Sequence, residues 1–253
     1  MLKIIVSGYN GTNGTILTKC IDENENLELV CGVSRSLNNG SYDGKNKLYK
    51  RMDYVEEKCD VIIDFSHPSN LDSILKYALS NKTPIVLATT GYSQEDLDQI
   101  DIASKQIPIL LSSNTSLGVN IFIELVKNAA TLLKNFDIEI IDKHHDRKED
   151  APSGTASMLA NAIKEVHPEK YNTYGRHGRD AKRNNHEIGI HAIRGGTIVS
   201  DHDVIFAGDS EVLTLTHEAQ SDVIFAKGSL AAAEYLQNKT DGLYEMKDVL
   251  NIN

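Results

Sequence analysis

The chain has few of the residues that build disulfide frameworks, metal clusters or membrane spans. Its three cysteines, Cys20, Cys31 and Cys59, are scattered and show no metal-ligand spacing, so we expect buried thiols in a reducing compartment. No window holds the roughly 20 apolar residues that a membrane-spanning helix needs. The N-terminus lacks the apolar core and cleavage site of a signal peptide. These absences predict a cytoplasmic protein with no membrane partner.

Positive charge is also in short supply. Lys and Arg number 26 against 36 Asp and Glu, which gives a net charge of -10. A nucleic-acid-binding protein usually has a basic face, so this balance argues against a nucleic-acid partner. The 253 residues are 40% hydrophobic and 25% charged, which is enough for one large or two small globular domains. A basic run at residues 144–148 therefore stands out against an acidic average.

The first 33 residues predict a nucleotide-binding unit. An apolar run at residues 2–6 reads as a buried strand, and residues 8–14 form a G-x-x-G-x-x-G loop. A helical pattern follows over residues 15–21, and a second strand over residues 27–33. In such a βαβ unit the glycines allow a tight turn and a close approach of the backbone to a pyrophosphate.

The residues at the end of the second strand indicate whether the cofactor is NAD or NADP. An acid at this position bonds the 2′-hydroxyl of NAD, whereas a basic residue accommodates the 2′-phosphate of NADP. Here the chain reads Ser34-Arg35. A serine can bond a phosphate and an arginine can pair with it, so the sequence favours NADP(H).

Strands and helices then alternate, which is typical of a doubly wound α/β domain. Apolar runs at residues 60–66, 84–88 and 107–111 predict further strands, and residues 71–79 and 93–100 predict helices. The pattern changes after a longer helix at residues 119–133. We expect a strand at 136–141, a period-two strand from His186, and strands at 204–206 and 212–216, joined by short turns. This second region predicts an α+β domain with a mixed or antiparallel sheet.

The stretch His144-His145-Asp146-Arg147-Lys148-Glu149-Asp150-Ala151-Pro152-Ser153-Gly154-Thr155-Ala156 has the highest density of titratable groups. Imidazole can move protons near neutral pH, and lysine supplies a compact cation. We expect Asp150 to cap a helix that Pro152 begins. The free N–H groups of such a helix end attract carboxylates. The stretch thus predicts a site that binds a carboxylate and transfers protons beside it.

With both halves in view, the chain resembles the 4-hydroxy-tetrahydrodipicolinate reductase family, also called the dihydrodipicolinate reductases. The most specific shared run is His-His…Lys…Asp-Ala-Pro-Ser-Gly-Thr at residues 144–155. Further agreement lies in the glycine loop at 8–14, Asp64-Phe65-Ser66, Thr89-Thr90-Gly91, Ser116-Leu117-Gly118-Val119-Asn120, Arg194-Gly195-Gly196, Asp201-His202 and Gly242-Leu243-Tyr244. Some positions depart from the family pattern, notably Ser34, Ala88, Thr115 and Asp201.

The resemblance implies an NAD(P)H-dependent oxidoreductase of diaminopimelate and lysine biosynthesis. It would reduce 4-hydroxy-tetrahydrodipicolinate, by way of dihydrodipicolinate, to tetrahydrodipicolinate. The implied catalytic residues are His144, a proton donor or acceptor, and Lys148, a proton donor. The implied substrate-binding residues are His145, Gly154 and Thr155. The implied cofactor-binding residues are Gly8, Tyr9, Asn10, Gly11, Thr12, Asn13, Arg35, Ala88, Thr89, Thr90, Ser112, Ser113, Asn114 and Thr115.

The resemblance also implies a homotetramer joined through the sheets of the second domain. We expect a dinucleotide-binding domain at residues 1–115, on which residues 223–253 pack back. Residues 116–222 would form the domain for substrate binding and oligomerisation.

Several alternatives remain. One is another two-domain dehydrogenase, such as one acting on aspartate, and another is a nicotinamide-sensing protein without catalysis. We predict no metal site, because adjacent histidines without further ligand spacing are a weak signal. The sequence leaves open the choice between NADH and NADPH, and whether the enzyme itself dehydrates the substrate. It also leaves open which of Arg176, Arg179 and Arg183 meets a substrate carboxylate.

Overall fold

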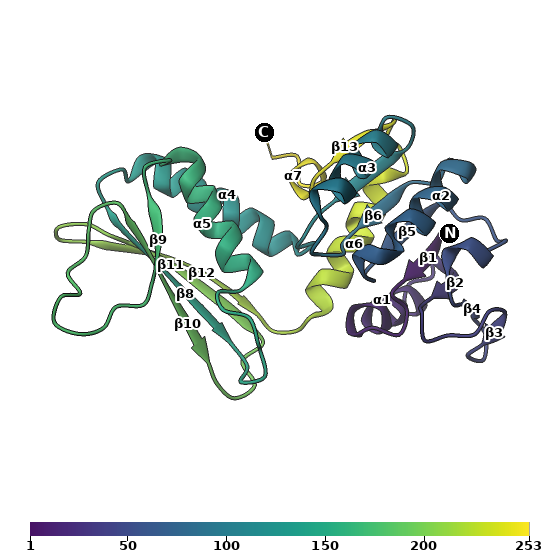
Figure 1. Ribbon diagram of the computed structural model, residues 1–253, viewed down its shortest axis with the longest axis horizontal. Helices are drawn as coiled ribbons and strands as arrows, with labels where there is room; N and C mark the ends of the chain where they lie inside the picture. The colour runs from purple at the N-terminus through teal and green to yellow at the C-terminus, as the bar shows by residue number, and fades with distance from the viewer. Residues whose placement is uncertain (253) are drawn as a thin grey trace. The chain divides into compact units, whose positions relative to one another are not determined.

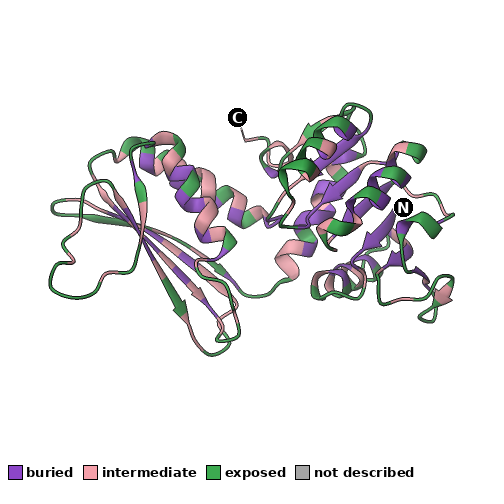
Figure 2. Ribbon diagram, viewed as in Figure 1, coloured by how far each residue is buried: buried purple, intermediate pink, exposed green. Residues whose placement is uncertain are grey.

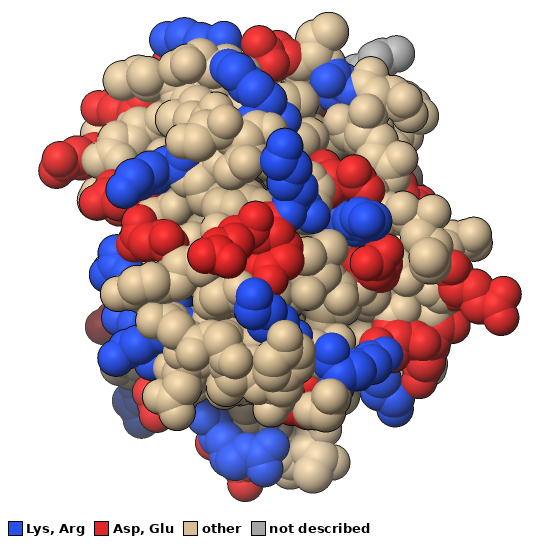
Figure 3. Space-filling view, turned by 90° about the vertical axis from the view of Figure 1, so that its right-hand side faces the viewer, with Lys and Arg blue, Asp and Glu red and all other residues tan. Residues whose placement is uncertain are grey.

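The computed structural model describes residues 1–252, and the chain divides into two compact units (Figure 1). Unit 1 contains residues 1–117 and the segment from Asp222 onward, and unit 2 contains residues 118–221. Within the described residues, no helix combines the length and the apolar character that crossing a bilayer requires. On the face that Figure 3 shows, basic side chains are interspersed with acidic ones.

Unit 1 is built on an eight-stranded sheet in the order β13-β7-β6-β5-β1-β2-β4-β3. All neighbouring strands are parallel except β3 and β4. The strands are β1 (Leu2–Ser7), β2 (Leu27–Val33), β3 (Ser41–Tyr42), β4 (Lys47–Tyr49), β5 (Val61–Asp64), β6 (Ile85–Leu87), β7 (Pro108–Leu111) and β13 (Gly242–Tyr244). Its helices are α1 (Thr12–Asp22), α2 (Leu71–Asn81), α3 (Gln94–Ser104), α6 (Val223–Leu236) and α7 (Met246–Val249).

Two separate apolar cores lie on the two faces of this sheet. Ile5 and its same-face neighbours pack with α2 and α3, whereas Ile4 and Val6 pack with α1 and α6. Strands buried on both faces read as continuous apolar runs in the sequence, and Figure 2 colours most of them as buried. The predicted doubly wound α/β unit is confirmed. The strand order reverses on either side of β1, and in such sheets ligands bind outside the carboxyl ends of the strands at this point.

Unit 2 has a five-stranded mixed sheet in the order β12-β11-β8-β10-β9. Its strands are β8 (Asp137–His144), β9 (Tyr171–Tyr174), β10 (Glu187–Arg194), β11 (Ser200–Ala207) and β12 (Val212–Ala219). The strands β9, β10 and β8 are parallel, and β11 is antiparallel to both of its neighbours. The predicted α+β domain with a mixed sheet is confirmed.

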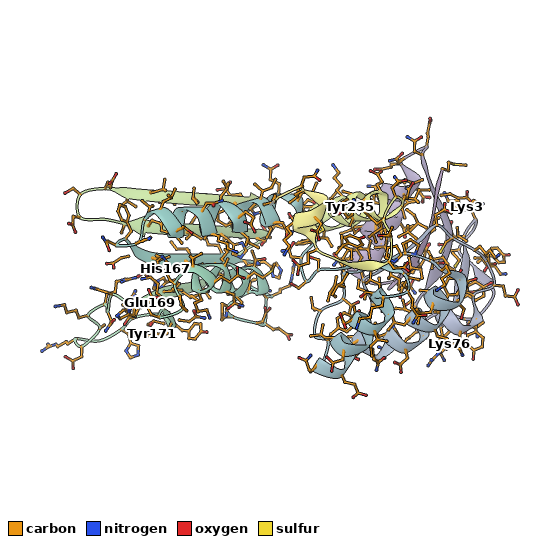
Figure 4. All side chains as sticks on the ribbon, turned by 90° about the horizontal axis from the view of Figure 1, so that it is seen from above. Lys3, Lys76, His167, Glu169, Tyr171 and Tyr235 are labelled. Carbon is orange, nitrogen blue, oxygen red and sulfur yellow. The ribbon has the colours of Figure 1, made fainter. Side chains whose placement is uncertain are left out.

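Helices α4 (Leu117–Leu132) and α5 (Gly154–Val166) pack on one face of the unit 2 sheet, over a core that includes Ile138 and Ile140. The connection from α5 to β9 contains His167 and Glu169, and Tyr171 begins β9 (Figure 4). Burial along β8 alternates strictly, so Asp142 and His144 follow Ile138 and Ile140 on the helix-covered face. Glu139, Ile141 and Lys143 lie on the opposite, open face.

Gly228 allows α6 to pack closely against the chain after β7 in unit 1. In the structure a Cβ at this position would lie 1.7 Å from the carbonyl oxygen of Thr115, and the Thr115 hydroxyl donates to the carbonyl of Phe225 at 2.7 Å. The absence of a side chain is therefore what allows the helix to approach the chain after β7.

We expect Gly228→Ala to destabilise unit 1 by about 1–3 kcal/mol, because the added methyl group overpacks a backbone contact that cannot yield easily. Urea unfolding followed by circular dichroism measures the change. Gly242→Ala is the matched control, since its Cβ would meet only the ring of Tyr244 at 3.4 Å. Equal stabilities of the two variants would contradict the close-packing role.

Candidate active site

The glycine loop after β1 is shaped by two close backbone contacts. Gly8 has a φ of +87°, and a Cβ there would lie 2.4 Å from the carbonyl oxygen of Phe65. A Cβ at Gly14 would lie 2.1 Å from the carbonyl oxygen of Gly8. Helix α1 begins at Thr12 with no side-chain cap at Gly11. The loop is thus a narrow cradle with unpartnered helix N–H groups, which suits a pyrophosphate.

Tyr9 forms one wall of this loop. Its ring occupies the place where a Cβ of Gly32 would lie, and its hydroxyl donates to Asp43. Burial and the hydrogen bond to Asp43 raise the pKa of Tyr9 to about 12, so the phenol stays neutral. Gly32 and Asp43 were not singled out from the sequence, because only the folded chain brings them to Tyr9.

The end of β2 carries hydroxyls and one cation, and no acid. The Arg35 guanidinium donates to the hydroxyl of Ser69 at 2.6 Å. The Ser34 and Ser36 hydroxyls lie 3.4 Å apart, and the Asn10 amide donates to Ser36 at 3.0 Å. This group of donors suits an anion beside the glycine loop.

The segments after β6 and β7 lie at the carboxyl edge of the same sheet. Ala88 and Thr89 are buried, and Thr90 is exposed. The Thr89 hydroxyl donates at 2.6 Å to Asp64, a carboxyl group whose pKa is raised by complete burial. The chain after Leu111 is held by a backbone bond from Ser112 to Leu87.

Four of the predicted cofactor-binding residues, Ser112 to Thr115, follow β7. The Ser112 hydroxyl donates to the carbonyl of Asn114 at 2.7 Å. Thr115 is almost fully buried and bonds to α6, so it holds the segment in place. The structure thus brings every predicted cofactor residue to one edge of the unit 1 sheet or to its glycine loop.

In unit 2, His144 ends β8 and lies beside a buried carboxylate. Its Nδ1 is 2.7 Å from Oδ1 of Asp142. The two side chains point the same way because they are two residues apart on one strand. His202, directly opposite Asp142 on β11, places its Nε2 3.4 Å from the same oxygen. Asp142 and His202 are fully buried, and His144 is 7% exposed.

The other oxygen of Asp142 is tied to the start of α5. Oδ2 accepts a hydrogen bond from the Ser153 N–H at 2.7 Å and one from the Arg194 guanidinium at 3.2 Å. Arg194 also donates to the carbonyl of Asp150 at 2.9 Å. The sequence singled out neither Asp142 nor the role of Arg194, although alternation along β8 places Asp142 on the same face as His144.

The predicted helix cap is wrong in its residue. Helix α5 begins at Gly154, and Ser153 is its N-cap, with its hydroxyl accepting from the Ala156 N–H at 3.1 Å. Asp150 pairs instead with Lys148, whose Nζ lies 2.7 Å from Oδ1. Because α5 begins at Gly154, Pro152 lies before the helix and does not begin it, and the peptide bond between Ala151 and Pro152 is cis.

Open space surrounds the start of α5. A Cβ on Gly154 would meet nothing within 4 Å, and Thr155 follows in the first helical turn. The Nδ1 of His145 is buried without a hydrogen-bond partner. The predicted residues of unit 2 therefore lie at the end of β8, in the loop that follows it, and in the first turn of α5. They are His144, His145, Lys148, Gly154 and Thr155.

Two of the three arginines that the sequence left open for a substrate carboxylate, Arg176 and Arg183, lie on the other face of the sheet. Arg176 pairs with Glu139 at 2.9 Å, and Arg183 pairs with Asp137 at 2.6 Å and with Glu139 at 3.1 Å. Glu139 is on the open face of the sheet, opposite to His144. These two arginines are therefore held away from the predicted site, and Arg194 is the guanidinium beside it.

Asp142, His144 and His202 bring one ligand atom each within 4.8 Å of one another, the spacing of a metal-binding cluster. The carboxylate, however, already meets the Arg194 guanidinium and the positive end of α5 through the Ser153 N–H. A metal ion here would add to this positive charge. We therefore interpret the cluster as a hydrogen-bonding and charge network.

We expect the ring of His144 to titrate near pH 4, well below the value of about 6.5 for an exposed histidine. Burial lowers this pKa, Asp142 partly offsets the effect, and His202, Lys148 and Arg194 lower it further. An NMR titration of the ring protons measures the midpoint. His144→Gln identifies the signal, and the urea-unfolded chain provides the reference. A folded-state midpoint near that of the unfolded chain would contradict this assignment.

The same shift makes stability pH-dependent. Because the pKa of His144 is lower in the folded state, the unfolded chain takes up the proton first, and stability falls as pH drops from about 6.5 toward 4. Burial raises the pKa of Asp142, but the neighbouring His202 and the Ser153 N–H, which donates to Oδ2, overcome this effect and hold the pKa well below its usual range. Its stabilisation is lost only at lower pH, below about 3.9. Between pH 7 and pH 5, His144→Gln should therefore lose less stability than the wild type.

Comparison with known proteins connects both units to one family. Residues 2–115 match the family model described as dihydrodipicolinate reductase, N-terminus, and residues 118–250 match its C-terminal counterpart. A 4-hydroxy-tetrahydrodipicolinate reductase of Caldanaerobacter subterraneus is 47% identical, over 99% of this chain and 98% of that protein. The protein of the same name from Clostridium tetani is 46% identical with the same coverage.

Solved structures agree at the level of the fold. A dipicolinate-bound dihydrodipicolinate reductase from Paenisporosarcina sp. TG-14 has a TM-score of 0.81 and 24% identity, with 100% of both chains covered. A probable dehydrogenase from Thermotoga maritima has a TM-score of 0.61 and 10% identity, with 99% of this chain and 93% of that one covered. The glycine cradle, the His-Lys turn and the full-length sequence identity lead to one conclusion: the chain belongs to the dihydrodipicolinate reductase family.

Proposed function

We propose that this chain catalyses the NAD(P)H-dependent reduction of 4-hydroxy-tetrahydrodipicolinate, by way of dihydrodipicolinate, to tetrahydrodipicolinate in diaminopimelate and lysine biosynthesis. Relatives 40–47% identical over nearly the whole chain have the name of this reductase. The observation that carries the proposal is the segment between β8 and α5, which gathers His144, His145, Lys148 and a helix N-terminus with free space beside Gly154. A cyclic imine with two carboxylates requires both a cationic cradle and a proton-transferring group.

The cofactor is NADH or NADPH, and the unit 1 residues fit it. The cradle at Gly8 and Gly14 is space that a Cβ would fill, and residues 8–13 would hold the pyrophosphate. Residues 88–90 and 112–115 would lie on the nicotinamide side, because they follow β6 and β7 at the carboxyl edge. When bound, the cofactor supplies the hydride, and the protein supplies position and charge.

The substrate carboxylates would meet the turn after β8. The N–H groups at Gly154 and Thr155 belong to the first turn of α5, where an anion is favoured. Lys148 and His145 add positive charge or a hydrogen bond along the same turn. The ion pair of Lys148 with Asp150 keeps the ammonium within the loop, and an incoming carboxylate would replace or join that partner.

His144 would move the proton that the reduced ring requires. Its pKa of about 4 makes the imidazole neutral at pH 7 in the free protein. A dianionic substrate would raise this pKa, because nearby negative charge favours the imidazolium. His144 would then take up a proton as the substrate binds and donate it to the ring, with Lys148 as a second proton donor.

The two units would divide the work. Residues 1–115, with residues 223–253 packed back on them, would bind the dinucleotide, and residues 116–222 would bind the substrate and form the oligomer. The open face of the unit 2 sheet carries Ile141, Ile193, Ile205 and Val212, and the last of these is 63% exposed. These apolar side chains, which lie among the ion pairs of Glu139 and Lys143 on the same face, support a homotetramer. Light scattering that gave a monomer or a dimer would contradict it.

We expect His144→Gln and Lys148→Ala each to lower kcat by about 10²–10⁴-fold, because each removes a positioned proton-transferring group. NADPH binding, measured by fluorescence, should be unchanged. Oxidation of NADPH is followed by absorbance, with substrate generated from pyruvate and aspartate semialdehyde by the preceding synthase.

Matched controls are His177→Gln and Lys182→Ala, which change exposed side chains of the same unit and should retain wild-type turnover. Near-normal kcat in His144→Gln or Lys148→Ala would contradict the assigned roles. A wild type that binds NADPH tightly but shows no synthase-dependent oxidation would contradict the proposed reaction.

We expect Arg35→Ala to raise KM for NADPH about tenfold and to change KM for NADH little, because the 2′-phosphate loses a charge-assisted partner. Steady-state kinetics with each cofactor measures the two values. Arg51→Ala is the control, since Arg51 pairs with Asp53 in the same unit at 2.9 Å. Equal losses for both cofactors would show that Arg35 does not contact the 2′-phosphate.

A further inference from the structure

Asp142 joins several parts of the site that the proposed reaction needs. It is the sixth residue of β8 and the third on the buried face of that strand, where the face changes from isoleucine to polar side chains. Its carboxylate is fully buried. A buried carboxylate is unfavourable unless several donors surround it, so the surrounding groups show what the position does.

The two oxygens of Asp142 have different neighbours. Oδ2 accepts from the Ser153 N–H and from Arg194, and thereby holds the first residue before α5. Oδ1 faces Nδ1 of His144 at 2.7 Å and Nε2 of His202 at 3.4 Å. The His202 Nε2 also lies 2.9 Å from the Ser153 hydroxyl, so His202 supports both the carboxylate and the helix cap.

The contact between His144 and Asp142 determines a tautomer. A nitrogen and a carboxylate oxygen 2.7 Å apart repel unless a proton lies between them. The short distance therefore favours the tautomer of neutral His144 with its hydrogen on Nδ1, which leaves Nε2 without one. In this resting geometry the N–H does not point at the carboxylate, and neither Nδ1 nor Oδ1 has a well-formed hydrogen bond. Catalytic hydrogen bonds often become aligned only when substrate is bound.

We propose that Asp142 is a positioning residue, whose Oδ1 selects the Nδ1–H tautomer of His144 while its Oδ2 fixes the N-terminus of α5. The proposal rests on the proposed function, because it concerns how that site is held. One buried carboxylate thus sets both the nitrogen that exchanges the proton and the helix end that receives a substrate carboxylate. Loss of the carboxylate should lower kcat and raise the substrate KM together.

Other titratable and charged groups surround Asp142 and His144, and the test must account for them. His202 on β11 and Arg194 on β10 lie beside both side chains, Lys148 on the following loop acts on His144, and His217 on β12 lies opposite His202. A change in stability alone would not separate a positioning role from loss of this network. The tautomer and titration of His144 do separate them, because they report on one ring.

The first measurement uses the wild-type protein and needs no variant at Asp142. Nitrogen-15 NMR of the histidine rings at pH 7 should show His144 with the proton on Nδ1, and His144→Gln assigns the signal. A wild-type ring protonated on Nε2 would overturn the proposal. Because this measurement needs neither substrate nor turnover, it is independent of whether the proposed reaction is correct.

The second measurement compares Asp142→Asn with Asp142→Glu, which keeps a carboxylate. Asp142→Asn should lower kcat about 10²-fold, as for loss of a positioned proton-transferring group, raise the substrate KM, and leave NADPH binding unchanged. Its His144 ring should lose the Nδ1–H preference and titrate at a lower pH. Asp142→Glu should recover much of kcat and the Nδ1–H tautomer. Asp209→Asn, which removes a carboxylate from an exposed turn of the same unit, should behave as the wild type.

Two results would overturn the proposal. One is an Asp142→Asn variant with kcat within threefold of the wild type. The other is a variant with low kcat whose His144 tautomer and titration are unchanged, which would assign Asp142 a structural role alone. If Asp142→Asn does not fold, the proposal is tested by the tautomer of His144 in the wild type and by kcat and the His144 tautomer in Asp142→Glu. A wild type inactive on the substrate but with the Nδ1–H tautomer would contradict the proposed function and leave the pairing established.

Discussion

The buried carboxylate of Asp142 is the constraint on which the catalytic half of the molecule depends. Four groups from four different segments converge on it: His144 on its own strand, the Ser153 N–H before α5, Arg194 on β10 and His202 on β11. Because an isolated buried carboxylate is strongly unfavourable, each of these segments must be in place for the others to be stable. The carboxylate of Asp142, on the helix-covered face of the unit 2 sheet, therefore fixes both ends of the loop that contains Lys148.

The nucleotide half depends on close approach of backbone to backbone. Gly8, Gly14 and Gly228 each lie where a Cβ would overlap a carbonyl oxygen, those of Phe65, Gly8 and Thr115 respectively. The first brings the loop after β1 against the chain after β5, the second brings α1 against the end of β1, and the third brings α6 against the segment after β7. These contacts leave the helix N–H groups of α1 open at the edge of the sheet, where the strand order reverses around β1.

The charges around His144 determine its protonation state. In the free protein, burial and neighbouring cations keep His144 neutral, and a substrate with two negative charges reverses part of this effect. The arginines of the opposite sheet face do not contribute, because Arg176 and Arg183 are paired with Glu139 there. The positive charge at the site therefore comes from Lys148, Arg194 and the start of α5, and not from the arginines on the other face of the sheet.

Most of the architecture could be read from the sequence, since local patterns have local causes. The apolar runs of β1, β5, β6 and β7 predicted a parallel sheet, because strands covered on both faces have few polar positions. The helix cap was misassigned because Asp150 and Ser153 are both good N-cap residues. Only the fold shows that Asp150 forms an ion pair with Lys148, whereas the Ser153 hydroxyl accepts a hydrogen bond from the Ala156 N–H.

The run from His144 to Thr155 by itself determined which residues form the proton-transferring turn, because they are neighbours in the chain. Only the tertiary structure decided what surrounds them. Asp142, Arg194 and His202 are up to 60 residues apart in sequence, and their contact follows from the register of β8 with β10 and β11. Register is set by the burial of a whole sheet face, and no local pattern in a single sequence contains it.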